Sequence, residues 1–136
     1  MKPAALGIAA LLTAMATLAA APARACGFCI EDKVAAAYDH AVVARARGQG
    51  HEVVYLSLEF TRPVDRDTAG KIARAIERVA SVDRGSVRVA VDAGSVALAF
   101  DAKRAPAGAM LDAVERAVKP LGARTALLQF GGPAGI

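Results

Sequence analysis

The chain has 136 residues and a formal net charge of +4, and its first 25 residues contain two basic residues and no acidic one. The other 111 residues carry 15 basic and 13 acidic residues, enough chain for one small domain with a modest core and too little for two. A net charge of +2 with mixed signs gives no case for nucleic acid, and no Trp, two Tyr and four Phe argue against stacking platforms.

Residues 1–25 have the pattern of an export signal. A positively charged start is followed by an apolar run over residues 4–21 and by a proline. Ala23 and Ala25 are small residues at the −3 and −1 positions of a cleavage point before Cys26. We therefore expect a periplasmic or secreted protein that has no membrane span after cleavage. The alternatives are an uncleaved membrane anchor and a lipoprotein attached at the first mature cysteine.

Residues 26–50 combine a cysteine motif with a helical pattern. The motif Cys-Gly-Phe-Cys places Cys26 and Cys29 three positions apart, and the chain has no other cysteine. Apolar residues from Ile30 to Val42 recur at spacings of three and four, which predicts a single helix with one apolar stripe. The glycines of residues 48–50 then mark its end.

From residue 52 the apolar period changes to two and then alternates with helical patterns. The first strand has apolar residues at every second position, which predicts that it is half-buried. Turn and helix-start signals separate the later elements, including a tight hairpin turn at residues 92–94. The predicted strands are 52–60, 86–91, 95–101 and 123–130, and the predicted helices are 65–80 and 106–118.

The order βαββαβ predicts an α+β fold of the ferredoxin-like kind, with a four-stranded antiparallel sheet and two helices on one face. An extra N-terminal helix precedes it. We therefore divide the chain into a signal peptide (1–25), the cysteine motif with its helix (26–50), the ferredoxin-like domain (51–131) and a tail (132–136). The apolar stripe of the extra helix is expected to pack on the open face of the sheet or to join a homodimer.

A βαββαβ pattern over residues 52–130 in an exported chain with a CxxC motif resembles the heavy-metal-associated domains of copper chaperones and metal-transporting ATPases. Those domains carry the metal-binding cysteines in the loop between the first strand and the first helix. Here that loop, residues 61–65, reads Thr-Arg-Pro-Val-Asp and holds no cysteine. The resemblance therefore implies the fold, and no metal ligand is carried over by position.

Three interpretations of the cysteine pair compete. Two thiolates can bind a soft metal, copper(I) first, with a metal-delivering or metal-accepting protein as partner. Zinc is less favoured because it needs four ligands, and His40 lies about 16 Å from Cys29 along a straight helix. The motif also looks like a thioredoxin-type redox motif, although no buried strand precedes it. The third interpretation is a Cys26–Cys29 disulfide with a structural or docking role.

We predict metal binding by Cys26 and Cys29 as the function, with a non-catalytic redox or interaction module as the alternative. No Ser-His-acid arrangement, phosphate loop or carboxylate pair at a recognisable spacing indicates an enzyme. His40 and His51 are interpreted as surface or internally satisfied histidines, which could share a site only near the end of the first helix. The arginines are interleaved with acidic residues and are interpreted as a solvated surface.

Overall fold

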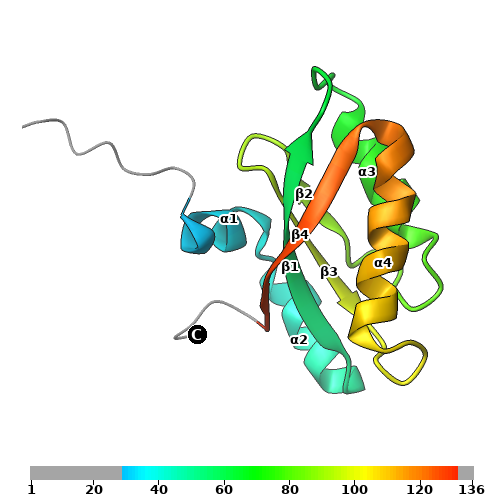
Figure 1. Cartoon of the computed structure of the whole chain (residues 1–136). Helices are drawn as coiled ribbons and strands as arrows, with labels where there is room; N and C mark the ends of the chain where they lie inside the picture. Colours follow the sequence, from blue (N-terminus) through cyan, green and yellow to red (C-terminus); the bar gives the residue numbers. More distant parts are fainter. Residues whose placement is uncertain (1–28, 132–136) are drawn as a thin grey trace, which may run out of the picture.

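The computed structural model describes residues 29–131 of the chain (Figure 1). The expected signal peptide, Cys26 and the tail at 132–136 lie outside the described residues. The helices are α1 (Ile30–Ala37), α2 (His40–Gln49), α3 (Thr68–Glu77), α4 (Ala107–Val118) and the short 3₁₀ helix η1 (Lys119–Leu121). The strands are β1 (Glu52–Phe60), β2 (Arg88–Ala90), β3 (Ser95–Phe100) and β4 (Ala123–Phe130).

The four strands form one antiparallel sheet in the order β2-β3-β1-β4. The two central strands, β1 and β3, are in register with Val54 opposite Leu98 and Leu56 opposite Val96. The helices α3 and α4 lie together on one face of the sheet (Figure 1). This topology confirms the predicted ferredoxin-like α+β fold.

The first hydrophobic core fills the space between this face of the sheet and the helices α3 and α4. Ile72 and Ile76, one helical turn apart on α3, are fully buried there. The residues of β1 that alternate inward meet them, as the period of two predicts. The buried members of this core are Val54, Leu56, Leu58, Ile72, Ile76, Val82, Val87, Val96, Leu98, Phe100, Met110, Val114, Val118 and Ala123.

The second face of the sheet is covered by α1 and α2, and here the structure corrects the prediction of a half-buried first strand. Six consecutive residues of β1, from Val53 to Leu58, are buried, because the strand has a core on each side. The second core contains Val34, Ala37, Val42, Val43, Ala46, Val53, Tyr55, Ala97 and Ala99. The apolar stripe of this segment therefore packs on the open face of the sheet, which is one of its two expected partners.

The predicted single helix over residues 30–47 is two helices, α1 and α2. Tyr38 and Asp39 between them have extended backbones, with ψ angles of 131° and 111°. The Asp39 carboxylate accepts hydrogen bonds from the backbone N–H groups of Ala41 at 2.9 Å and Val42 at 3.3 Å, and so caps α2. Its other oxygen accepts from Arg88 Nε of β2 at 2.7 Å. The apolar spacing runs through the break, which is why it predicts one helix.

The strand β2 is shorter than the predicted 86–91 because a side chain replaces part of the backbone ladder. The hydroxyl of Ser86 accepts a hydrogen bond from the backbone N–H of Ala99 at 3.0 Å. The hydroxyl also lies 2.6 Å from the carbonyl oxygen of Asp83. Ser86 thus satisfies the edge of β3 just before β2 begins.

Replacing Asp39 tests how the α1–α2 break is held. We expect Asp39→Ala to lower the melting temperature by roughly 5 °C, because α2 loses its cap and Arg88 loses its partner. Asp39→Asn keeps a capping oxygen and is expected to cost less. Asp112→Asn, an exposed acid on α4, is the matched control and should change the melting temperature by less than about 2 °C.

The same pair predicts a pH dependence of stability. The hydrogen bond from Arg88, and then that from the Val42 N–H, hold the pKa of Asp39 below its ordinary value of 3.8. A carboxyl with a depressed folded-state pKa stabilises the fold above its unfolded pKa and loses this contribution as the pH falls through the folded value. The melting-temperature gap between wild type and Asp39→Asn should therefore be full at about pH 6 and shrink below about pH 3.8. A gap that is the same at pH 3 and pH 6 would contradict this.

Removing the buried hydroxyl of Tyr55 is expected to stabilise the protein, whereas the Asp39 substitutions are expected to destabilise it. Its side chain is fully buried in the second core, and its hydroxyl has no hydrogen-bond partner in the described structure. Burial is the main cause that raises the pKa of Tyr55. We expect Tyr55→Phe to increase the free energy of unfolding by about 1 kcal/mol, because it removes an unpaired buried polar group. Urea unfolding measures the change, and a loss of stability would show that the hydroxyl is paired.

Candidate functional site

The described half of the cysteine motif lies at the very start of α1. Cys29 is exposed and is the residue that precedes the first turn, with an extended backbone. Its carbonyl oxygen accepts the first helical hydrogen bond, from the Lys33 N–H at 3.1 Å, while its side chain caps nothing. The thiol is therefore accessible to an ion or a partner. Cys26, the other predicted ligand, lies outside the described residues.

Cys29 has a defined place because α1 is anchored to the sheet. Val34 and Ala37, on the inner side of α1, are 1% and 2% exposed and pack in the second core. The start of α1 lies on the opposite side of the sheet from α3 and α4 (Figure 1). The thiol is thus carried on the face of the sheet that a plain βαββαβ domain leaves open.

The loop between β1 and α3 is the place where heavy-metal-associated domains carry their cysteines. In this chain it is held by its own polar contacts. Arg62 donates from Nη2 to the carbonyl oxygen of Pro120 at 2.7 Å, and Thr61 donates from its hydroxyl to that of Gly122 at 3.1 Å. Asp65 is bound by the hydroxyl of Thr68 and by the Lys71 ammonium, at 2.8 and 3.2 Å. These contacts engage the polar side chains of the loop, and its sequence contains no cysteine.

The two histidines lie at opposite ends of α2 and do not share a site. His40 begins α2, is exposed, and lies 3.3 Å from the Tyr38 hydroxyl through its Nδ1. The ten residues of α2 separate it from His51 by about 15 Å. His40 is also separated from Cys29 by the eight residues of α1, about 12 Å. Within residues 29–131, no group of three or more His, Cys, Asp or Glu is placed to hold a metal ion.

His51, two residues after the end of α2, contacts an aspartate in each of two loops, Asp83 and Asp101. Its Nδ1 lies 2.8 Å from Asp83 Oδ2, and its Nε2 lies 3.8 Å from Asp101 Oδ2. All three side chains are about one-fifth exposed. His51 is therefore internally satisfied, which is one of the two interpretations from the sequence. Its partners are far from it along the chain, so residue spacing could not identify them.

No family model and no curated protein matches the chain. Solved structures that resemble it include a copper binding domain from HMA7, a P-type ATPase, at 15% identity and a TM-score of 0.46, covering 58% of this chain and 96% of that one. The N-terminal domain of PacS from Synechocystis PCC6803 has 27% identity and a TM-score of 0.42, covering 57% and 97%. Oxidized MerP from Ralstonia metallidurans CH34 has 18% identity and a TM-score of 0.44, covering 57% and 96%.

The resemblance is one of fold. It agrees with the predicted likeness to heavy-metal-associated domains, which rested on the order of the elements. At these TM-scores it says nothing about what this chain binds. Only the chain's own residues can indicate which ligand it binds.

The contact between His51 and Asp83 is expected to stabilise the attachment of α2. We expect His51→Ala to reduce the free energy of unfolding by about 1 kcal/mol, because a partly buried hydrogen bond is lost. His40→Ala, at the exposed start of α2, is the matched control and should change it by less than about 0.5 kcal/mol. Urea unfolding at pH 7 measures both variants. Equal effects would mean that the His51 contact contributes nothing.

Proposed function

We propose that the protein captures or hands over a soft metal ion, copper(I) first, through the thiolates of Cys26 and Cys29. The observation that carries the proposal is the exposed thiol of Cys29 at the start of a helix fixed to the sheet. A second cysteine lies three positions before it. That spacing allows two sulfur atoms to converge on one small ion.

Copper(I) suits this ligand set better than zinc does. Monovalent copper is soft and accepts two thiolates, whereas a structural zinc site needs four ligands. His40 is kept from Cys29 by the length of α1, and His51 is engaged by Asp83. An open two-thiolate site also leaves room for a partner's sulfur ligands, so the ion can pass from one protein to another by ligand exchange. A metal-delivering or metal-accepting protein is the partner we propose.

Export through residues 1–25 is part of the same proposal. A dithiol at the beginning of a mature periplasmic or secreted protein meets metal ions and partners that arrive from outside. No helix among residues 29–131 is both long and apolar enough to cross a membrane. We propose a carrier and no enzymatic reaction, because the proposed chemistry is the binding and release of an ion.

Copper uptake tests the proposal directly. The mature chain from Cys26, reduced and kept without oxygen, is titrated with Cu(I) against a chromogenic chelator. We expect about one Cu(I) per chain, and no chelator-resistant copper in the variant with both Cys26→Ser and Cys29→Ser. Cys29 is exposed, so this variant should keep the circular dichroism spectrum of wild type. His40→Ala is the matched control and should bind copper as wild type does.

The competing interpretation gives a different result in the same experiment. Protein isolated from the exporting cells would have a mass two hydrogens lower than the dithiol, and after reduction it would take up no copper. That outcome would overturn the metal proposal in favour of a Cys26–Cys29 disulfide with a redox or docking role.

A further inference from the structure

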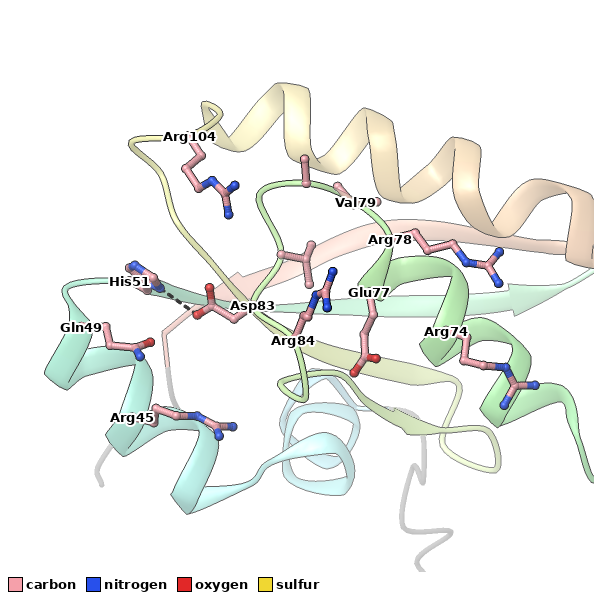
Figure 2. A pocket seen from close by; sticks show the side chains of 12 residues that line it. Arg45, Gln49, His51, Arg74, Glu77, Arg78, Val79, Asp83, Arg84 and Arg104 are labelled. Carbon is pink, nitrogen blue, oxygen red and sulfur yellow. Dashed lines mark hydrogen bonds and ion pairs between the residues drawn. The ribbon is translucent and has the colours of Figure 1, made fainter.

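A cleft of about 990 Å³ opens between the end of α2, the end of α3 and the loops that precede β2 and α4 (Figure 2). We call it the arginine cleft. It is lined by Arg45, Gln49, His51, Arg74, Glu77, Arg78, Val79, Ala80, Val82, Asp83, Arg84 and Arg104. It lies at the far end of α2 from His40, and Cys29, the described residue of the cysteine motif, is not among its lining residues.

Five arginines from four separate segments line this cleft. Arg45 belongs to α2, Arg74 to α3 and Arg78 to its end, while Arg84 and Arg104 come from two different loops. Arg45, Arg84 and Arg104 extend toward the hollow from different sides, whereas the guanidinium groups of Arg74 and Arg78 point away from it along α3 (Figure 2). Only two acidic residues, Glu77 and Asp83, line the cleft with them.

Four of these five guanidinium groups have no partner within residues 29–131. Arg45 donates to the carbonyl oxygen of Gly85 at 3.4 Å, and the side chains of the other four make no hydrogen bond or ion pair there. The two carboxylates also have hydrogen-bond partners other than these arginines. Glu77 accepts from the Gly85 N–H at 3.0 Å, and Asp83 lies 2.8 Å from His51 Nδ1. Five arginines against two carboxylates leave the lining with a formal excess of three positive charges, and the unpaired guanidinium groups can donate to a ligand.

We propose that the arginine cleft binds a small polyanion that carries several phosphate groups. A guanidinium offers a planar fork of donors that fits two phosphate oxygens at once. Each exposed contact contributes little on its own, so a ligand must bridge several arginines to bind. A short polyphosphate chain carries several charges close together, so it can bridge Arg45, Arg84 and Arg104 across one cleft. These arginines surround a single hollow of limited volume and do not form an extended track, which argues against nucleic acid as the ligand.

Calorimetry with inorganic tripolyphosphate at low salt, about 50 mM, tests the proposal on the full mature chain. We expect saturable binding that the triple variant Arg45→Ala, Arg84→Ala, Arg104→Ala weakens at least about tenfold. The matched control removes three exposed arginines outside the cleft, with Arg66→Ala, Arg116→Ala and Arg124→Ala. It lowers the net charge equally and should leave the affinity within about twofold.

Three outcomes would overturn the proposal. Equal weakening by the two triple variants would show that net charge alone attracts the anion. Equally tight binding of citrate would show that the cleft does not select phosphate. Absence of binding to wild type at millimolar tripolyphosphate would also reject it. As a second readout, amide shifts in NMR spectra are expected to change at residues 45, 74–85 and 104, and changes confined to other residues would place the anion elsewhere.

Discussion

Tyr55 and Leu56 are neighbours in β1, yet they belong to different hydrophobic cores. Successive side chains of a strand point to opposite faces, so a strand whose residues from Val53 to Leu58 are all buried needs a cover on each side. The helices α3 and α4 provide one cover, and α1 with α2 provides the other. The place of Cys29, the break at Asp39 and the position of α2 beside the arginine cleft all follow from this requirement.

The βαββαβ core was predictable because its strands and helices each repeat with their own period. The two-sided burial of β1 was not, since Tyr55 and Ser57 read as the polar half of an alternating strand. The break between α1 and α2 was hidden for a similar reason, because apolar residues continue at helical spacing on both sides of Asp39. An aspartate followed by a helical run is a known start signal, and it was the one local indication.

For the candidate sites, the sequence indicated the chemistry and only part of the placement, because it predicted a helix on the open face of the sheet but not its break at Asp39. The CxxC spacing indicates two thiolates, and the sequence itself excludes the β1–α3 loop. The structure adds that Cys29 lies at the start of α1, on the second face of the sheet. The arginines show the reverse. Along the chain they alternate with acidic residues and resemble an ordinary solvated surface. Arg45 and Arg84 line the same cleft because α2 and the loop before β2 reach the same end of the sheet.

The attachment of α1 and α2 also has a consequence for the order in which the chain folds. Their core is completed by Ala97 and Ala99 of β3, which come much later in the chain. The earliest described segment therefore lacks a complete surface to pack against until β1 and β3 have paired, and contacts of such long sequence separation close at a higher entropic cost. The burial of Val34 of α1 therefore depends on the pairing of β1 with β3, and a change that separated these strands would also release the start of α1, where Cys29 lies.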